Sequence, residues 1–87
     1  PRVVLVAPVP VGPITAQSEM WGFGAAVETS RQLAGMYEIV AADHDAAFFD
    51  AGSVAEVHPG DGVHLDADAC ASLGAAMAEV VRAQFER

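Results

Sequence analysis

The chain has 87 residues, 53% of them apolar, and twelve acidic against four basic residues give it a formal charge of −8. This length allows one small domain with a thin core, and no stretch approaches the roughly 20 apolar residues of a membrane span. Arg2, Arg31, Arg82 and Arg87 are scattered, whereas nucleic acids and anionic membranes require a clustered basic face, so both partners are excluded.

The first predicted element is a strand over residues 2–7, where the run Val-Val-Leu-Val-Ala precedes Pro8. Without polar alternation, both faces of this strand are apolar, which is typical of an interior strand in a parallel sheet covered by helices. Residues 8–17 hold three prolines and Gly12. They predict a loop that leaves the carboxyl end of the strand.

A helix is predicted from about Ala26 to Ala42, because its apolar residues fall mostly on one stripe. Residues 18–24 are ambiguous, since Ser18 and Glu19 suit a helix start but two glycines weaken one. Residues 46–50 then predict a second short strand. The stripe of the helix consists of Val27, Leu33, Ala34, Tyr37, Val40 and Ala41.

Residues 51–65 predict an irregular segment punctuated by Pro59, Gly60 and Gly62. Asp66 suits the N-cap of a final helix over residues 67–85, and Asp68 places an acid in its first turn. The predicted apolar face of this helix comprises Cys70, Leu73, Met77, Val80, Val81 and Phe85. Its predicted polar face comprises Glu79, Arg82, Glu86 and Arg87.

Cys70 is the only cysteine, so the chain forms no intrachain disulfide. We expect it to pack as a small apolar residue. Nothing in the cysteine usage indicates an oxidising compartment, which favours a cytoplasmic location without fixing it.

The order strand, helix, strand, helix predicts an α/β fold with a parallel sheet, since a right-handed crossover joins successive parallel strands. Two strands cannot bury both faces of such a sheet. The apolar fraction is also higher than a small independent domain usually carries. We therefore expect either that the chain oligomerises or that it is the C-terminal part of something longer.

The segment Asp61-Gly62-Val63-His64 places a carboxylate three residues before an imidazole. One turn can present both side chains to the same point, where the aspartate would orient or polarise the imidazole. The segment follows a strand of the sheet, and ligands of open α/β sheets gather at the carboxyl edge. The pair alone is a weak motif, for which a capping aspartate and a structural histidine are the commoner explanation.

Other polar residues are weaker candidates. His58, with Asp61 and His64, offers metal-ligand types, but neither a helical histidine pair nor a cysteine pair supports a metal site. Ser53 follows a strand, yet residues 54–59 do not suit the helix start behind a nucleophile turn, so we expect a surface serine. His44 is expected in solvent at the opposite edge of the sheet.

Four apolar or aromatic side chains are candidates for an acyl or alcohol pocket beside His64. Trp21 and Phe23 follow the first strand, and Ile14 and Val63 belong to the same edge of the predicted sheet. Ordinary core or subunit contacts explain each of them at least as well. A tryptophan in a loop rich in proline and glycine nevertheless suggests binding or an interface.

Asp61-Gly62-Val63-His64-Leu65, followed by an acid-capped apolar helix, resembles the C-terminal signature of the SGNH (GDSL-type) serine esterases and acyltransferases. The opening strand into Ala7-Pro8-Val9-Pro10 is similar to their fourth conserved region. Tyr37 to Val54 resembles the helix, strand and loop that follow it. The similarity covers nearly the whole chain and is closest to the arylesterase-like branch.

This resemblance implies a flavodoxin-like three-layer sandwich in which residues 1–87 form the C-terminal portion of a single hydrolase domain. In the family, the histidine is the general base for a serine and the aspartate orients it, roles that carry over to His64 and Asp61. The implied substrate is a small carboxylic ester that reacts through an acyl-serine. No metal or organic cofactor is implied.

The family's nucleophile and most of its oxyanion hole have no counterpart in these 87 residues. The chain contains no asparagine, and none of its serines follows a Gly-Asp pair. We therefore expect the chain alone to be inactive, and expect the N-terminal part of the same domain and further copies of the chain as partners. The alternative is a non-enzymatic α/β module that oligomerises through its unpaired strand edges.

Overall fold

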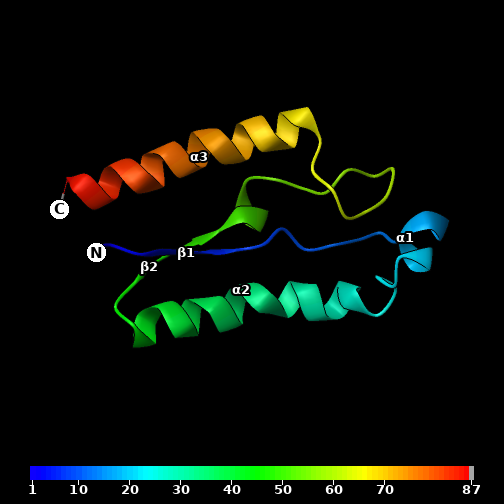
Figure 1. The fold of residues 1–87 in the computed structure, drawn as a ribbon, viewed down its shortest axis with the longest axis horizontal. Coiled ribbons are helices and arrows are strands. Elements are labelled where there is room, and N and C mark those ends of the chain that lie inside the picture. The colour runs from blue at the N-terminus through cyan, green and yellow to red at the C-terminus, as the bar shows by residue number, and fades with distance from the viewer. Residues whose placement is uncertain (87) are drawn as a thin grey trace.

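The structure is a computed structural model that describes residues 1–86, so Arg87, predicted on the polar face of the last helix, lies outside the described residues. Two short strands, three α-helices and one 3-10 turn follow one another along the chain (Figure 1). Their order is β1 (Val4–Ala7), α1 (Ala16–Met20), α2 (Ala26–Asp43), β2 (Ala47–Asp50), η1 (Ala51–Ser53) and α3 (Ala67–Phe85).

The two strands pair in parallel, with Val4 opposite Ala47 and Ala7 opposite Asp50. Helix α2 crosses between them on one side of the sheet, and α3 lies on the other side (Figure 1). The predicted α/β class with a parallel sheet is therefore confirmed, and the layers are those of a flavodoxin-like fold. Both strands begin slightly later than predicted, at Val4 and Ala47.

The two long helices have nearly the predicted bounds. Asp66 caps α3 as predicted, because its Oδ1 accepts a hydrogen bond of 2.8 Å from the backbone N–H of Ala69. This bond satisfies one of the free N–H groups at the helix start. Helix α2 begins without a side-chain cap and buries Ser30 and Ala41.

The ambiguous segment before α2 contains a helix that begins earlier than the sequence indicated. Its N-cap is Thr15, so Ala16 and Gln17, predicted as loop, belong to α1. The hydroxyls of Thr15 and Ser18 each accept a hydrogen bond from the other residue's backbone N–H, which stabilises a helix of only five residues. Gly22, with φ of +91°, follows the end of α1.

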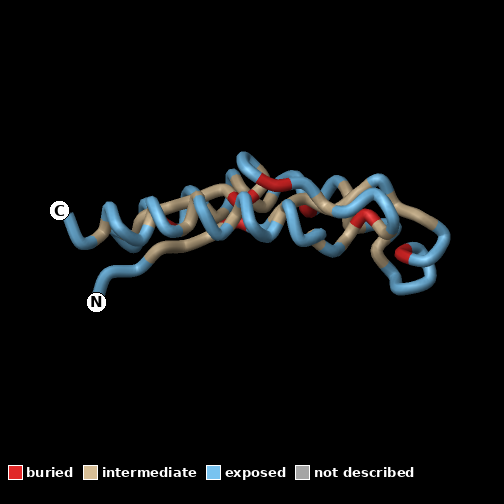
Figure 2. Tube along the Cα trace, turned by 90° about the horizontal axis from the view of Figure 1, so that it is seen from above, coloured by how far each residue is buried: buried red, intermediate tan, exposed pale blue. Residues whose placement is uncertain are grey.

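The core is small and contains no large side chain. Among residues 1–86 the buried apolar residues are all alanines, and Figure 2 shows few buried positions along the chain. The predicted packing of Cys70 is wrong, since it is exposed, as are Val40, Val81 and Phe85 on the predicted apolar faces. Nothing among the described residues covers these parts of the helices. The buried apolar residues are Ala7, Ala41, Ala51 and Ala55.

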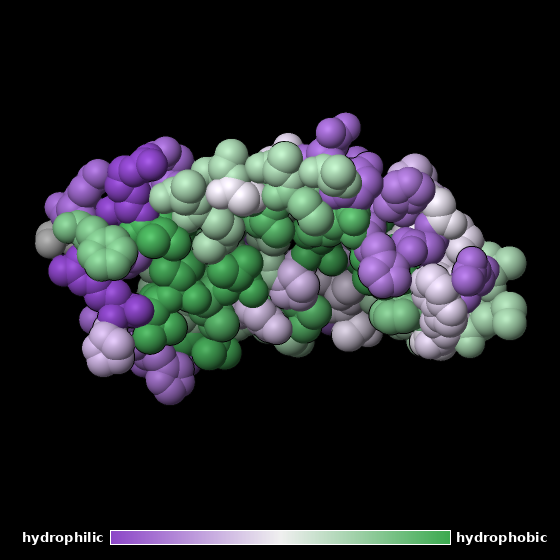
Figure 3. Space-filling view, turned by 45° about the horizontal axis from the view of Figure 1, so that its top comes forward, coloured by the Kyte–Doolittle hydropathy of each residue, from purple (hydrophilic) through white to green (hydrophobic). Residues whose placement is uncertain are grey.

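The exposed apolar side chains form a continuous area over the middle of the molecule, bordered by polar groups at both ends (Figure 3). The molecule measures 46 × 28 × 17 Å, so it is a thin slab. Within residues 1–86, no helix combines the length and the apolar character needed to cross a membrane.

Candidate active site

The turn from Asp61 to His64 brings its two candidate side chains into direct contact. The Asp61 Oδ2 atom lies 2.7 Å from His64 Nδ1. Asp61 Oδ1 accepts two further hydrogen bonds, of 2.8 Å from the Val63 N–H and 2.9 Å from the His64 N–H. One carboxylate therefore builds the turn and holds the imidazole at the same time.

These hydrogen bonds favour the ionised carboxylate of Asp61 and select one tautomer of the imidazole. The N–H groups of His64 and Val63, and then the His64 imidazole, donate to the carboxylate and lower the pKa of Asp61 to about 2. An ionised carboxylate only accepts hydrogen bonds, so Nδ1 of His64 is the donor, and in the neutral imidazole this tautomer leaves the lone pair on Nε2. The imidazole is 70% exposed, and Nε2 has no hydrogen-bond partner within residues 1–86.

Gly62 allows this turn to pack against the loop that follows β1. Its φ is +72°, and a Cβ built on it would lie 2.0 Å from the backbone oxygen of Pro13. The Gly62 oxygen also accepts a 2.7 Å hydrogen bond from the Gly12 N–H. A side chain at position 62 would separate the two loops, so glycine is needed here for backbone conformation and for close approach.

The loop after β1 is anchored on its other side by α2. The Val11 N–H donates to the Ser30 hydroxyl at 3.0 Å, and this hydroxyl donates to the Val27 carbonyl at 2.8 Å. Ser30 is a buried residue of α2. The loop therefore forms a bridge between the helix that covers the sheet and the turn that carries His64.

The backbone of His58 closes the loop that carries the turn, between η1 and α3. Its N–H donates to the His64 oxygen at 2.7 Å, and its own oxygen accepts from the Gly62 N–H at 2.8 Å. The His58 side chain is exposed and its Nδ1 accepts a hydrogen bond from the Gly60 N–H at 2.8 Å. Among the residues that the structure describes, no three His, Cys, Asp or Glu side chains are grouped as metal ligands.

Of the four predicted pocket residues, Trp21 makes a ring contact with His64. The two ring centroids lie 5.8 Å apart and the ring planes are inclined by 86°, an edge-to-face arrangement. Val63 belongs to the turn itself, and its N–H contacts Asp61. Ile14 lies between Pro13 and the cap of α1, and Phe23 follows α1 with its N–H donating to Ser18; both side chains are partly buried.

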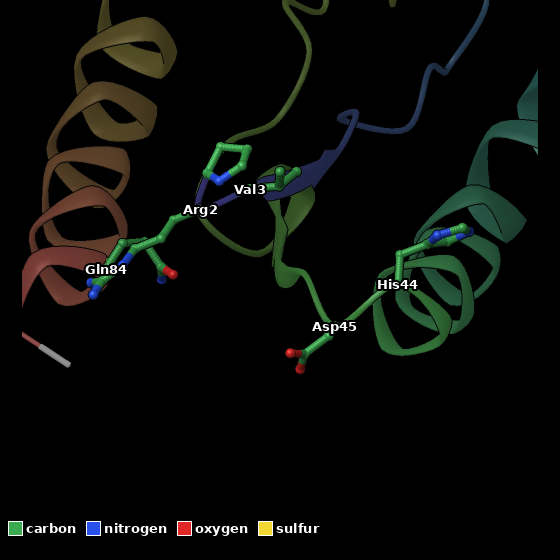
Figure 4. A pocket seen from close by; sticks show the side chains of 6 residues that line it. Arg2, Val3, His44, Asp45 and Gln84 are labelled. Carbon is green, nitrogen blue, oxygen red and sulfur yellow. The ribbon is translucent and has the colours of Figure 1, made fainter.

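Within residues 1–86, neither Ser53 nor His44 is hydrogen-bonded to Asp61 or His64 through its side chain. Ser53 is exposed on η1 and its hydroxyl donates to the Asp50 oxygen at 2.7 Å, as expected for a surface serine. His44 is the exposed C-cap of α2, at the end of the molecule opposite α1 (Figure 1). It borders a hollow of 340 Å³ that Arg2 and Gln84 line from the other side (Figure 4).

An apolar hollow of 480 Å³ lies beside the two packed loops. It opens between the loop after β1 and the segment after β2, so it lies at the carboxyl edge of the sheet, where α/β proteins bind their ligands. Its lining residues are Val9, Pro10, Gly12, Pro13, Gly52, Ala55, Glu56, Val57 and Pro59.

Sequence reasoning missed Gly12 and Ser30, which hold the loop after β1 in place. Gly12 has a φ of +113° and packs against Val27 of α2. The only signal in the sequence was a glycine among three prolines, which indicated a loop but not its partners. The contact between Trp21 and His64 also depends on how the loops pack, and spacing alone does not reveal it.

Solved structures with this fold include a carbohydrate acetylesterase from Sinorhizobium meliloti, with 36% sequence identity and a TM-score of 0.90 over 98% of this chain and 40% of that one. The aryl esterase of M. smegmatis shares 34% identity, with a TM-score of 0.87 over 95% of this chain and 39% of that one. A putative arylesterase from Agrobacterium tumefaciens shares 44% identity, with a TM-score of 0.79 over 94% of this chain and 38% of that one.

The chain thus spans about 40% of the length of the solved structures it matches. No protein-family model and no curated protein sequence matches it. The TM-scores of 0.79 to 0.90 show that the three similar structures share the fold of this chain.

Proposed function

We propose that this chain is part of an SGNH-type serine esterase, in which His64 and Asp61 are the base and the orienting residue of a Ser-His-Asp triad. Its identity of 34% to 44% with three solved esterase structures supports this proposal. The observation that carries this proposal is the 2.7 Å contact between Asp61 Oδ2 and His64 Nδ1, which leaves Nε2 exposed. The family resemblance at the same two residues supports it.

In the proposed reaction, His64 Nε2 removes the proton of a serine hydroxyl as the serine oxygen attacks the ester carbonyl. The resulting imidazolium donates that proton to the departing alcohol when the tetrahedral intermediate collapses. Water then attacks the acyl-serine by the same route. Asp61 keeps Nδ1 protonated and stabilises the imidazolium throughout.

The serine and the oxyanion-hole asparagine have to come from residues other than these 87, since no serine here follows Gly-Asp and no asparagine is present. We infer that residues 1–87 are the C-terminal portion of a single hydrolase domain. Removing a triad nucleophile from a serine protease costs about 10⁶-fold in kcat. The chain by itself is therefore inactive.

The substrate is a carboxylic ester with a small acyl group. The names of the similar proteins, acetylesterases acting on carbohydrates and aryl esterases, support this class. Ile14, Phe23 and Val63 would contact the acyl or alcohol part beside His64, whereas Trp21 contacts the imidazole itself. Transfer of the acyl group to an alcohol in place of water uses the same residues.

The test is hydrolysis of p-nitrophenyl acetate by the full-length protein and by its His64→Ala variant. Loss of the base lowers kcat by about 10⁴- to 10⁶-fold, because the serine is no longer deprotonated. His44→Ala is the matched control, since this exposed histidine lies at the opposite end of the molecule, and its activity stays unchanged.

A fluorophosphonate probe identifies the nucleophile in the same samples, and we expect the label on a serine outside residues 1–87. Two results contradict the proposal. One is hydrolysis by the isolated 87-residue chain that disappears with His64→Ala. The other is a full-length His64→Ala variant as active as the wild type, which would favour the non-enzymatic module.

A further inference from the structure

The structure records two side-chain contacts of the His64 imidazole within residues 1–86. One is the hydrogen bond from Nδ1 to Asp61, and the other is the ring contact with Trp21. The centroid distance of 5.8 Å and the inclination of 86° fall in the range that aromatic pairs prefer. The imidazole is otherwise open to solvent, since 70% of its side chain is exposed.

One hydrogen bond at Nδ1 restrains a single atom of the ring. The imidazole can still pivot about that bond and move Nε2 sideways, away from a serine hydroxyl. Trp21 contacts the ring at nearly a right angle, so it opposes this movement. On this geometry, and on the function proposed above, we propose that Trp21 is a positioning residue that holds the His64 imidazole in the orientation required for proton transfer.

Trp21 is itself held by the start and end of α1. The paired hydroxyls of Thr15 and Ser18 fix the first turn, and Ser18 is completely buried. At the other end, the Trp21 N–H donates to the Gln17 oxygen at 3.2 Å. A short helix restrained in this way fixes the backbone that carries the indole, and Trp21 itself is 46% exposed.

The path from α1 to His64 is short and rigid. Only Pro13 and Ile14 separate the cap at Thr15 from Gly12, which is hydrogen-bonded to Gly62 in the turn. Val11, directly before Gly12, is also anchored on α2, because its N–H donates to the Ser30 hydroxyl. The hydrogen bonds of this loop to the turn and to α2 thus fix the distance between the backbones that carry the indole and the imidazole.

A positioning role and a role as a pocket wall predict different kinetics. Loss of a substrate contact alone raises KM, whereas displacement of the base lowers kcat. Displacement of a reacting group by about 1 Å can lower a rate by about 10²-fold. Trp21→Leu removes the ring but keeps an apolar side chain, and Trp21→Phe keeps a smaller ring.

The experiment compares these two variants of the full-length protein with wild type, using p-nitrophenyl acetate. We expect Trp21→Leu to lower kcat by about 10- to 100-fold with KM within about twofold, and Trp21→Phe to restore most of the loss. Met20→Leu is the matched control, because Met20 precedes Trp21 in α1 and is 86% exposed. It leaves both constants unchanged.

The NMR signals of the His64 ring protons provide a second readout, assigned by their loss in His64→Gln. Removal of the indole ring current in Trp21→Leu shifts these signals, whereas Met20→Leu does not. If Trp21→Leu does not fold, Trp21→Phe and Trp21→Tyr give the same comparison with smaller shifts.

A raised KM with unchanged kcat in Trp21→Leu overturns the positioning role, and so do His64 signals that do not move. Failure of the proposed function is distinguishable from this outcome. In that case His64→Gln keeps full activity, while the ring-proton signals still report whether Trp21 contacts His64.

Discussion

At the scale of single residues, Asp61 both holds the turn in shape and orients the His64 imidazole. Its carboxylate accepts two backbone N–H groups and one imidazole N–H, and these bonds make the loop and align His64. Replacement of Asp61 therefore removes the loop contacts and the orientation of the proposed base together. In a serine protease, aspartate to asparagine lowers kcat by about 10⁴-fold, because the wrong tautomer results.

The low pKa of Asp61 predicts how stability depends on pH. The pKa of about 2 in the folded protein lies below the value of about 4 in an unfolded chain. The ionised carboxylate therefore stabilises the folded state above pH 4, and this contribution is lost as the pH falls toward 2.

Urea denaturation of the wild type and of Asp61→Asn across this range measures the effect. We expect the difference in free energy of unfolding to be largest above pH 4 and to shrink between about pH 4 and about pH 2. A difference that stays constant over this range would contradict the assignment of the low pKa to Asp61.

Gly62→Ala tests the close packing of the two loops. The new Cβ would meet the Pro13 oxygen, and φ of +72° is unfavourable for alanine. We expect a loss of about 1 to 3 kcal/mol in the free energy of unfolding, together with lower esterase activity as the turn moves. Chemical denaturation and a p-nitrophenyl acetate assay measure both effects.

Gly35→Ala is the control for this variant. Gly35 lies inside α2, and a Cβ there meets no atom within 4 Å. Alanine is the better helix former, so this substitution stabilises the protein by about 0.5 to 1 kcal/mol. If both substitutions change the free energy of unfolding in the same direction, the packing of Gly62 against Pro13 does not limit stability.

At the scale of elements, side-chain caps decide where α1 and α3 begin. Asp66 provides the cap of α3, directly after the loop that carries the turn. The start of α3 therefore defines where the loop ends. In α1 the same task falls to Thr15 and Ser18, which bond to each other and place Trp21 one helical turn farther on.

Asp66→Ala removes the acceptor for the Ala69 N–H. We expect it to lower the free energy of unfolding by about 1 kcal/mol, and Asp66→Asn to retain most of the stability because asparagine is an equally good cap. Thermal or urea denaturation of the two variants separates the cap from a general effect of charge. Equal losses in both variants would show that the negative charge matters and the cap does not.

At the scale of the whole molecule, the described residues are less compact than a complete domain. Their radius of gyration is 14.3 Å, against about 12 Å for a compact domain of 87 residues. The buried apolar residues among them are alanines, while Met36, Ile39 and Phe85 are more than half exposed. An apolar area of this extent indicates surfaces that another part of the protein or another copy covers.

The isolated 87-residue chain should therefore associate with itself or bind the rest of its domain. We expect sedimentation velocity to show dimers or larger species rather than a 9.0 kDa monomer. Addition of the N-terminal part of the full-length protein should replace them by a one-to-one complex with esterase activity. A stable, inert monomer under both conditions would contradict the proposed division of the domain.

Much of the fold follows from local features that the sequence displays directly. The apolar run before Pro8 predicts β1, the apolar stripes predict α2 and α3, and Asp66 predicts the start of α3. The face of α3 was harder to predict. Cys70 and Phe85 are exposed, because an apolar pattern shows that a face prefers burial but not whether a partner is present to cover it.

For the candidate site, the sequence by itself determined the pair, since a spacing of three residues with Gly62 between them allows one turn to join Asp61 to His64. Only the tertiary structure decided what surrounds the pair. Trp21 is 43 positions before His64 in the chain, and it reaches the imidazole because Gly12 and Gly62 join their two loops. Local hydrogen bonds depend on neighbouring residues, whereas contacts between distant loops depend on how the sheet and helices place them.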